Sequence, residues 1–263
     1  MTSIRKFGLL GHPLGHSFSR KFHNERFATL GINAVYENFD LEDIALLPAL
    51  LQSQPDLIGL NVTIPYKQAV MTYLDELDPL AQRIGAVNVV RIEHLVPAAD
   101  GSLPATRVPG LRLKGFNSDI VGFRDSLQPM LHGDEKKALV LGTGGASKAI
   151  FVALQDLGIE PVYVSRTATP GRLTYDDLTP EVMADHLVIV NCTPLGMFPK
   201  VDTCPDIPYD LLTPRHICFD CVYNPEETLF VKRALAQGAA AKCGYEMLIG
   251  QAIESYRIWT EGE

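Results

Sequence analysis

A glycine-rich turn near the middle of the chain restricts the possible folds more than any other feature. The apolar run Lys137–Leu141 predicts a buried strand, and residues Gly142 to Ser147 (GTGGAS) follow it and begin a helix that runs to about Leu157. Glycines allow the backbone of such a turn to approach a diphosphate, and amides at the helix N-terminus hold its charge. Because strand, glycine turn and helix occur together, we predict a dinucleotide-binding α/β unit. A tight turn without a ligand is the alternative.

The next predicted strand ends in a basic residue where an NAD site has an acidic one. After residues 162–164 come Ser165, Arg166 and Thr167, with Arg172 nearby. An NAD site uses Asp or Glu here to bind the ribose 2′-hydroxyl, whereas an arginine suits the 2′-phosphate of NADP. The sequence therefore favours NADP, and a solvated surface arginine is the alternative.

The N-terminal part of the chain alternates between predicted strands and helices. Its strands are predicted over residues 4–10, 34–39 and 57–60. Helices are predicted over residues 17–30 and 42–52, and two further helical segments follow the third strand, one that ends at residue 74 and one over residues 77–84. Such alternation is typical of a parallel α/β sheet. Two further strands, at 89–92 and 111–115, are joined by a long hairpin connection over residues 94–112. A helix at about 116–131 then leads into a second domain.

Residues Asn61 to Lys67 (NVTIPYK) place a lysine at the end of a strand. Pro65 prevents the strand from continuing as a paired one, so Lys67 lies at or just after the strand end, where open α/β sheets bind ligands. Proline also suits the first turn of a helix, and a cation at a helix N-terminus has a lowered pKa, which favours a proton shuttle. Lys67 is therefore a candidate acid or base, with a surface lysine of a βα loop as the alternative.

Several polar residues elsewhere could bind a ligand, and each has a structural alternative. Ser17 and Ser19 begin a helix, where they either cap it or bind a carboxylate. Asn88 lies in an apolar run and either ties down a loop or reaches a ligand. Asp119 suits the first turn of a helix and could also lie at the mouth of the cleft that holds the lysine. Gln251, on a largely apolar helix, is exposed unless that helix folds back on the first domain.

The composition argues against several classes of partner. The chain has 263 residues and a net charge of -8, which is unfavourable for binding nucleic acid or an anionic membrane. No apolar run approaches the roughly 18 residues that span a bilayer, and the N-terminus leads straight into a predicted strand, so no signal peptide is evident. Five cysteines without the spacing of a disulfide framework suggest reduced thiols in a cytoplasmic protein.

Two groups of residues have metal-site features but are explained better without a metal. Cys218 and Cys221 form a CxxC pair inside a predicted strand, where side chains three residues apart point to opposite faces. His12, His16 and His23 have no carboxylate or thiol in their loop to complete a ligand set. We expect loop or helix-surface roles for these histidines, and no metal.

Eight motifs, in order along nearly the whole chain, resemble those of the shikimate dehydrogenase family. They are GHPLGHSFS (11–19), NVTIPYK (61–67), GAVN (85–88), GFNSD (115–119), GTGGAS (142–147), NCTPLGM (191–197), DCVYNP (220–225) and GYEMLIGQ (244–251). The resemblance implies an N-terminal α/β substrate domain, residues 1–118 completed by 244–263, and a Rossmann-like NADP-binding domain, residues 119–243. It also implies NADP-dependent, reversible reduction of 3-dehydroshikimate to shikimate, on the route to chorismate and the aromatic amino acids.

The resemblance further implies roles for individual residues. Lys67 and Asp119 would be the catalytic pair. The side chains that would bind the substrate carboxylate and ring hydroxyls are Ser17, Ser19, Thr63, Asn88, Tyr223 and Gln251. The residues that would bind NADP are Gly142, Gly144, Gly145 and Ala146 at the diphosphate, Arg166 and Thr167 at the 2′-phosphate, and Met197 at the nicotinamide.

Three positions depart from the family pattern, and other functions remain possible. Val89 and Ser118 stand where threonine is usual, which bears on the preferred ring acid, and Ser165 stands where asparagine is common. A quinate/shikimate or amino-shikimate dehydrogenase of relaxed specificity is the alternative within the same class. A non-catalytic ligand sensor on the same fold would be expected to lack Lys67 or Asp119, and both are present. The expected partner is a small-molecule substrate, and the chain is expected to be a monomer or homodimer.

Overall fold

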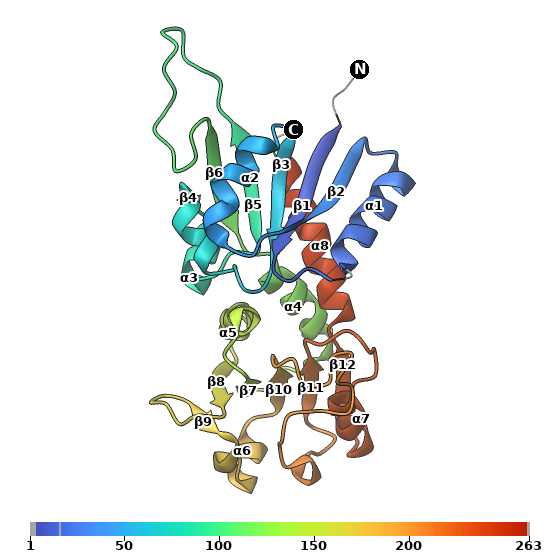
Figure 1. Cartoon of the computed structure of the whole chain (residues 1–263). Coiled ribbons are helices and arrows are strands. Elements are labelled where there is room, and N and C mark those ends of the chain that lie inside the picture. Colours follow the sequence, from blue (N-terminus) through green and yellow to red (C-terminus); the bar gives the residue numbers. More distant parts are fainter. Residues whose placement is uncertain (1–3, 16, 262–263) are drawn as a thin grey trace. The chain divides into compact units, whose positions relative to one another are not determined.

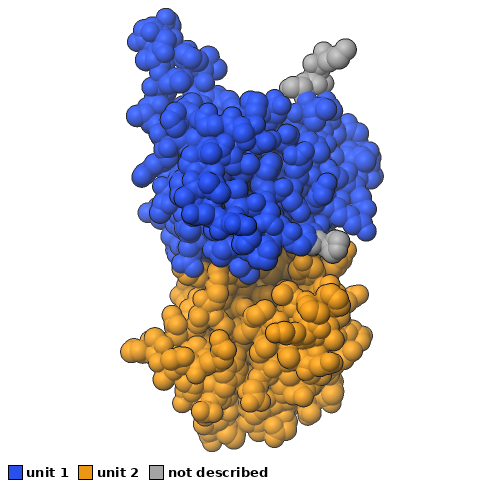
Figure 2. Space-filling view, viewed as in Figure 1, with its two compact units in different colours: residues 1–118, 252–263 blue, residues 119–251 orange. Residues whose placement is uncertain are grey.

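The computed structural model describes residues 4–15 and 17–261, so the expectation for His16 lies outside the described residues. The chain divides into two compact units: unit 1 is Met1–Ser118 with Ala252–Glu263, and unit 2 is Asp119–Gln251 (Figure 2). The division falls inside the C-terminal helix, whereas the sequence alone assigns all of residues 244–263 to the first domain.

Unit 1 is built on a six-stranded mixed sheet in the order β2-β1-β3-β5-β6-β4 (Figure 1). The strands are β1 (Arg5–Gly11), β2 (Ala34–Asp40), β3 (Leu57–Val62), β4 (Glu76–Leu77), β5 (Val89–His94) and β6 (Leu111–Phe116). Strand β1 is parallel to β2 and β3, as predicted, but β5 is antiparallel to both β3 and β6.

The parallel sheet predicted for the N-terminal part is therefore wrong from β5 onward, and the length of one helix explains why. Helix α3 (Pro79–Ile84) has six residues, about 9 Å of helix, whereas a six-residue strand is about 20 Å long. Because α3 is too short to carry the chain back along the sheet, β5 begins at the edge where β3 ends. The predicted hairpin between β5 and β6 is confirmed, and Figure 1 shows its connection as an extended loop.

The other helices of unit 1 follow local capping signals. Helix α1 (Phe18–Leu30) begins after Ser17, whose side chain accepts a hydrogen bond from the Arg20 amide, and ends at Gly31 in the left-handed region. The helix predicted over residues 42–52 consists of a 3₁₀ turn, η1 (Ile44–Leu46), and the short helix α2 (Leu47–Ser53). A further 3₁₀ helix, η2 (Ala69–Tyr73), follows β3.

The core of unit 1 lies on both faces of its sheet, because successive residues of a strand point to opposite sides. On one face Leu10 packs with Leu60 and with the buried side of α2. On the other face Phe7 packs with Phe27 of α1 and with Trp259 of α8 (Tyr245–Thr260). The rings of Phe7 and Trp259 are stacked, with centroids 4.8 Å apart. Residues from the two ends of the chain thus share one core.

A glycine on β3 makes room for this tryptophan. A Cβ atom at Gly59 would lie 2.4 Å from the Trp259 ring, so any larger residue there would displace the indole. The indole Nε1 donates to the Val90 carbonyl oxygen at 3.1 Å, which satisfies its buried N–H group. The C-terminal end of α8 is therefore an integral part of unit 1.

Unit 2 contains six parallel strands in the order β12-β11-β10-β7-β8-β9. They are β7 (Lys137–Leu141), β8 (Glu160–Ser165), β9 (Leu173–Thr174), β10 (Val188–Asn191), β11 (Ile217–Asp220) and β12 (Ala240–Cys243). Counted from β7, this is the 3-2-1-4-5-6 order of a doubly wound dinucleotide-binding sheet, and it confirms the predicted fold class. The strand order reverses between β7 and β10, which is where such sheets bind their ligands.

Four helices and three 3₁₀ turns complete unit 2 alongside α8. They are α4 (Asp119–Leu127), α5 (Gly145–Asp156), α6 (Pro180–Asp185), α7 (Leu229–Ala236), η3 (Gln128–Met130), η4 (Tyr175–Asp177) and η5 (Tyr209–Leu211). Within this unit α4 crosses the first turns of α8 closely, because a Cβ at Gly122 would lie 2.4 Å from the Met247 carbonyl oxygen. Among the described residues, no helix combines the length and apolar character needed to cross a membrane.

Candidate functional site

The candidate substrate residues of unit 1 gather at one edge of its sheet. Strand β1 leads to Ser17 and Ser19 at the start of α1, and β3 leads to Thr63 and Lys67. Asn88 immediately precedes β5, and because β5 is antiparallel to β3 it lies at the same edge. Backbone hydrogen bonds hold these segments together. The Val62 amide donates to the Asn88 carbonyl oxygen at 2.8 Å, and the Thr63 amide donates to the Leu10 carbonyl oxygen at 2.9 Å. The Val87 amide donates to the Lys67 carbonyl oxygen at 2.7 Å.

Lys67 does not stand at the N-terminus of an α-helix, as the sequence suggested. It is half-buried and precedes η2, a 3₁₀ helix of five residues that starts after Gln68. The helix-dipole argument requires aligned peptides over several α-helical turns, and η2 does not supply them. The predicted helix is therefore wrong here, and any role of Lys67 as an acid or base rests on its place at the strand edge.

The two serines at the start of α1 have different surroundings. Ser17 is the N-cap, and its Oγ accepts from the Arg20 amide at 3.2 Å. Ser19 lies in the first turn and is half-buried, and its side chain opposes the rise in the pKa of Tyr36 that burial causes. Ser17 therefore has the structural role that the sequence allowed, as the N-cap of α1.

Asn88 makes hydrogen bonds of the loop-tying kind, one of the two roles that its position in an apolar run allows. Its Oδ1 accepts from the backbone amide of Ser118 at 2.7 Å, and its Nδ2 donates to the Ser118 hydroxyl at 3.0 Å. Both residues are buried. The amide is thus held at a fixed orientation at the sheet edge.

In unit 2 the candidate cofactor residues lie at the carboxyl ends of the parallel strands. Gly142 follows β7 with φ +98, in the left-handed region, and a Cβ there would lie 2.9 Å from the Thr193 methyl group. Gly144 is the N-cap of α5, and a Cβ on it would meet no heavy atom within 4 Å, so open space lies beside this turn. Gly145 and Ala146 form the first turn of α5. An anion can approach the amides of this turn closely.

Ser147 occupies the place where the usual fingerprint has a third glycine or alanine. It is buried, and its hydroxyl donates to the Gly144 carbonyl oxygen at 2.7 Å. The side chain thus folds back onto the turn, which explains how serine is accommodated without opening the packing of α5 on the sheet.

Arg166 and Thr167 follow β8, the strand beside β7, and both are exposed. The hydroxyl of Ser165 donates to the Thr167 carbonyl oxygen at 2.6 Å and shapes this turn. Arg172, in the loop before β9, places its guanidinium carbon 5.7 Å from the centroid of the Tyr163 ring of β8, a cation–π arrangement. A positive side chain therefore stands at the strand end where a ribose phosphate would lie.

A buried polar cluster that the sequence did not predict supports the turn after β10. The Asn191 side chain donates to Asp220 Oδ1 at 2.9 Å and accepts from the Thr193 amide at 2.9 Å and hydroxyl at 2.7 Å. Asp220 also accepts from the Thr228 hydroxyl at 2.6 Å. Burial raises the pKa of Asp220 to about 6, opposed by the hydrogen bonds that it accepts. The sequence did contain a signal for this cluster, because Asn191 and Asp220 are each a polar residue at the end of an apolar strand.

Met197 and Tyr223 lie in the turns that this cluster supports. Met197 follows β10 and is 45% exposed, and Tyr223 follows β11 and is 37% exposed. The two turns are joined by a hydrogen bond from the Phe198 amide to the Asn224 carbonyl at 3.0 Å. Both side chains thus lie on connected turns at the carboxyl edge of the sheet.

The remaining two candidates of unit 2 lie on helices. Asp119 is the first residue of α4 and is buried. Gln251 is also buried, contrary to the exposed position expected by default, and its Nε2 donates to the Leu248 carbonyl oxygen at 2.9 Å. Close contact of Gly122 with the backbone of Gln251 holds the two helices together. Ile253, on the same helix as Gln251, is exposed.

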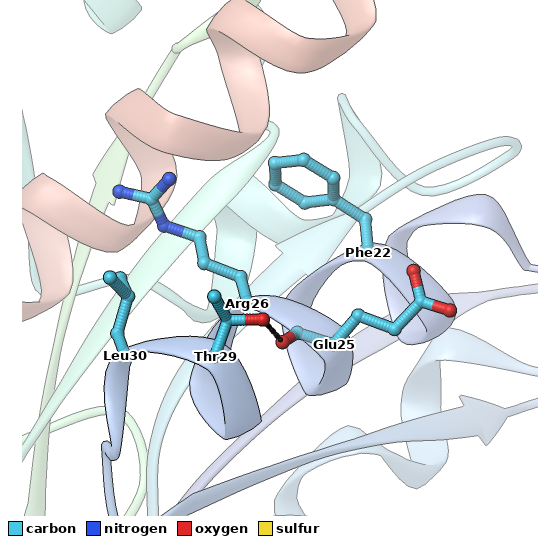
Figure 3. A pocket seen from close by; sticks show the side chains of 5 residues that line it. All are labelled: Phe22, Glu25, Arg26, Thr29 and Leu30. Carbon is cyan, nitrogen blue, oxygen red and sulfur yellow. Dashed lines mark hydrogen bonds between the residues drawn. The ribbon is translucent and has the colours of Figure 1, made fainter.

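One surface hollow lies apart from all these residues. It measures about 270 Å³ and is lined by Phe22, Glu25, Arg26, Thr29 and Leu30 of α1 (Figure 3). All five come from a single helix, and the hydrogen bond between them runs from the Thr29 hydroxyl to the Glu25 carbonyl. No group of three or more His, Cys, Asp and Glu suited to a metal ion occurs among the described residues.

Comparison with known proteins is consistent with this geometry. Residues 9–90 match the family model described as "Shikimate dehydrogenase substrate binding domain". The NADP(+)-dependent shikimate dehydrogenase of Caldanaerobacter subterraneus subsp. tengcongensis is 34% identical over 98% of this chain and 92% of that protein.

Two solved structures are also similar. Shikimate 5-dehydrogenase from Thermus thermophilus, in complex with NADP(H) and shikimate, is 31% identical with a TM-score of 0.79 and covers 97% of this chain and 93% of that chain. Quinate dehydrogenase from Corynebacterium glutamicum, in complex with NAD, is 28% identical with a TM-score of 0.81 over the same shares. Because the sequence similarity extends over nearly the whole of both chains, this chain belongs to the shikimate dehydrogenase family.

Proposed function

We propose that this protein is an NADP-dependent shikimate dehydrogenase, which reversibly reduces 3-dehydroshikimate to shikimate. The observation that carries the proposal is 34% sequence identity to an enzyme of that name over 98% of this chain. The doubly wound sheet of unit 2, with its glycine turn after β7, agrees with it. The exposed Arg166 at the end of β8 supports NADP rather than NAD, because a guanidinium suits the 2′-phosphate.

For the two units we propose separate tasks. Unit 1 would hold the ring acid at the sheet edge that carries Ser17, Ser19, Thr63 and Asn88, with Lys67 beside them. Unit 2 would hold NADP at the carboxyl edge of its sheet, through the glycine turn, Arg166, Thr167 and the turn that carries Met197. Asp119, Tyr223 and Gln251 of unit 2 would complete the substrate contacts.

The chemistry assigned to the protein's own groups is proton transfer. Bound NADPH would supply the hydride that reduces the C3 carbonyl. The oxygen that gains negative charge then requires a proton, and in the proposal Lys67 and Asp119 act as its general acid and base. Serine hydroxyls and the terminus of α1 would hold the substrate carboxylate without adding a formal charge.

The decisive experiment is a spectrophotometric assay with purified protein. Addition of 3-dehydroshikimate should cause NADPH absorbance to fall, and addition of shikimate with NADP⁺ should cause it to rise. If neither direction shows turnover while the protein is folded, the assignment is wrong, and the ligand-sensor alternative then predicts binding of the ring acid without turnover.

A relaxed specificity is the second candidate, because the similar Corynebacterium enzyme is a quinate dehydrogenase. Val89 and Ser118, which the family resemblance marks as unusual, lie at the substrate edge of unit 1. A panel of shikimate, quinate and an amino-shikimate, each with NADP⁺ and with NAD⁺, separates the two. A kcat/KM for quinate within about tenfold of that for shikimate would favour the relaxed enzyme.

A further inference from the structure

A continuous set of buried hydrogen bonds runs through unit 1 from Tyr36, whose hydroxyl interacts with the side chain of Ser19, to Asn88. Its members, in order, are Tyr36, Asn61, Ser255, Ser118 and Asn88. Tyr36, Ser118 and Ser255 are fully buried, and Asn61 and Asn88 are 5% and 3% exposed. Buried polar groups of this kind are costly unless all of them are paired, so such a set is more than ordinary packing.

The Asn61 carboxamide fixes the direction of the hydrogen bonds on either side of it. Its Nδ2 has two acceptors, the Ser255 hydroxyl at 2.8 Å and the Asn88 carbonyl at 3.3 Å, so its Oδ1 must face Tyr36. The Tyr36 hydroxyl therefore donates to Asn61, at 2.8 Å. One amide thus sets the orientation of the tyrosine hydroxyl that Ser19 contacts.

At the other end the set reaches Asn88 through two hydroxyls. The Ser255 and Ser118 hydroxyl oxygens lie 3.0 Å apart, and Ser118 is bonded to the Asn88 side chain through both its hydroxyl and its amide. Ser255 belongs to α8, so the last helix of the chain supplies the central link.

We propose that Tyr36, Asn61, Ser255 and Ser118 are positioning residues that hold Ser19 and Asn88 in the orientation that receives the ring acid. This inference rests on the proposed function and extends it to groups that need not touch the substrate. Because the hydroxyls act through other side chains, their loss should weaken binding of the ring acid and leave binding of the nicotinamide cofactor unchanged.

Tyr36→Phe is the test, since it removes one hydroxyl from the middle of the set. We expect KM for shikimate to rise roughly three- to tenfold, as expected for one hydrogen bond, with KM for NADP⁺ unchanged. Tyr256→Phe is the matched control, because the Tyr256 hydroxyl accepts from Arg5 at 3.2 Å in the same unit and lies outside the set. Its KM values should equal those of the wild type.

Ser255→Ala and the double variant with Tyr36→Phe complete the test. Because both hydroxyls act through Asn61, the double variant should raise KM for shikimate by less than the product of the single effects. A purely structural role predicts lower thermal stability with both KM values unchanged, and that result would overturn the inference. Failure of the proposed function looks different: the wild type itself would be inactive, which would also leave no ring acid to position.

A second observation, in unit 2, concerns two thiols at the ends of neighbouring strands. Cys192 directly follows β10 and Cys221 directly follows β11, and the Cys221 amide donates to the Asn191 carbonyl at 2.9 Å, which continues the ladder. Their sulfur atoms are 3.8 Å apart. Neighbouring strands lie about 4.8 Å apart, within the Cα separations of about 4.4–6.8 Å that a disulfide spans.

Both cysteines lie at the carboxyl ends of the unit 2 strands, where we propose that NADP binds. Cys192 leads into the turn that carries Met197, and its carbonyl group lies 3.4 Å from where a Cβ at Gly142 would stand. Cys221 leads to Tyr223, and its carbonyl oxygen lies 2.6 Å from a Cβ built on Gly244. The backbone of each cysteine therefore packs closely on a glycine of a neighbouring turn, so a shift of that backbone on forming a disulfide would move these turns.

The structure assigns Cys192 and Cys221 as an oxidisable dithiol whose disulfide form lowers affinity for NADP. The oxidant is a hydroperoxide. The Cys192 sulfur attacks its terminal oxygen, which breaks the O–O bond and gives a sulfenic acid and an alcohol or water. The Cys221 sulfur then attacks the sulfenic sulfur, forms the S–S bond and releases water, so the peroxide gains the two electrons that the thiols lose.

Two observations decide which sulfur reacts first and which cysteines do not take part. The hydrogen bond with Cys192, followed by burial, raises the pKa of Cys221 well above its usual value, so Cys221 forms the nucleophilic thiolate less readily and Cys192 reacts first. Cys221 gives up its proton only as it attacks the sulfenic sulfur, and that proton leaves in the water released. Burial raises the pKa of Cys218 to about 12, so the other half of the CxxC pair is unreactive.

Peptide mass spectrometry after treatment with hydrogen peroxide tests the assignment. We expect a Cys192–Cys221 cross-linked peptide, a loss of NADP⁺ binding measured by titration, and recovery of both with dithiothreitol. Cys192→Ser should resist the loss, whereas Cys204→Ser, which alters a half-buried thiol elsewhere in unit 2, should behave as the wild type. Absence of the cross-link, or an equal loss of binding in Cys192→Ser, would overturn the assignment.

Discussion

The imidazole of His23 is stacked on the phenol ring of Tyr36, with centroids 4.6 Å apart and an interplanar angle of 13°. His23 is fully buried, and among the described residues neither of its ring nitrogens has a hydrogen-bond partner. The sequence predicted a loop or helix-surface role, which is wrong for this residue. It lies instead in the aromatic core of unit 1, against α8.

The buried imidazole predicts a loss of stability in acid. Burial, and secondarily the charge of Arg26, lowers the pKa of His23 from 6.5 to about 3. Above pH 6.5 the residue is neutral in both states and contributes no pH dependence, but between pH 6.5 and 3 the unfolded state binds a proton that the folded state excludes. The free energy of unfolding should fall by about 4–5 kcal/mol over this range.

His23→Phe isolates this effect, because a phenyl ring keeps the stacking and cannot take up a proton. Urea unfolding at several pH values should show a smaller decline below pH 6.5 than in the wild type. Equal slopes for the two proteins would show that the imidazole is protonated at its ordinary pKa in the folded state.

The buried carboxyl of Asp220 should make the free energy of unfolding fall as the pH rises, the opposite of the effect of His23. Its pKa is raised to about 6, chiefly by burial, from 3.8. Below pH 3.8 the carboxyl is neutral in both states, and as the pH rises to 6 the unfolded state releases its proton first, so about 3 kcal/mol of stability is lost. Asp220→Asn keeps a neutral amide among Asn191, Val222 and Thr228, and its stability relative to the wild type should increase from pH 4 to 6. A pH-independent difference would contradict the raised pKa.

Lys67→Ala should separate catalysis from binding. We expect the variant to fold and to bind NADP⁺ like the wild type, and to lose about 10²- to 10⁴-fold in kcat, the usual contribution of a general acid or base. Lys232→Ala, which removes an exposed lysine of α7, is the control and should keep full activity. Turnover of Lys67→Ala near that of the control would remove Lys67 from the reaction.

Arg166→Ala should affect only the phosphorylated cofactor. Loss of a charge-assisted hydrogen bond predicts a KM for NADPH that rises by roughly ten- to a hundredfold, with kcat little changed and with KM for NADH unaltered. Arg215→Ala, which removes an exposed arginine paired with Asp134 at 2.8 Å, is the matched control. An equal rise for NADPH and NADH would place Arg166 elsewhere on the cofactor or outside its site.

The sequence predicted best where a local rule determines the structure. The strand, glycine turn and helix around Gly142, and the cap at Ser17, follow from neighbours a few residues away. Prediction from sequence failed where the residues that interact are far apart in the chain. The direction of β5 depends on the reach of α3, and the burial of His23 depends on Trp259, far along the chain. The pairing of Cys192 with Cys221 requires the strand order, which periodicity does not provide.

Trp259 packs onto Gly59 and Phe7, so unit 1 lacks part of its interior until the final turns of α8 are in place. During translation the ribosome releases the first strands long before this helix, and the whole of unit 2 emerges in between. The segment made first is therefore completed last. A chain that ended before Ala252 would contain all the strands of unit 2 and an N-terminal sheet without the indole that covers Gly59 and Phe7.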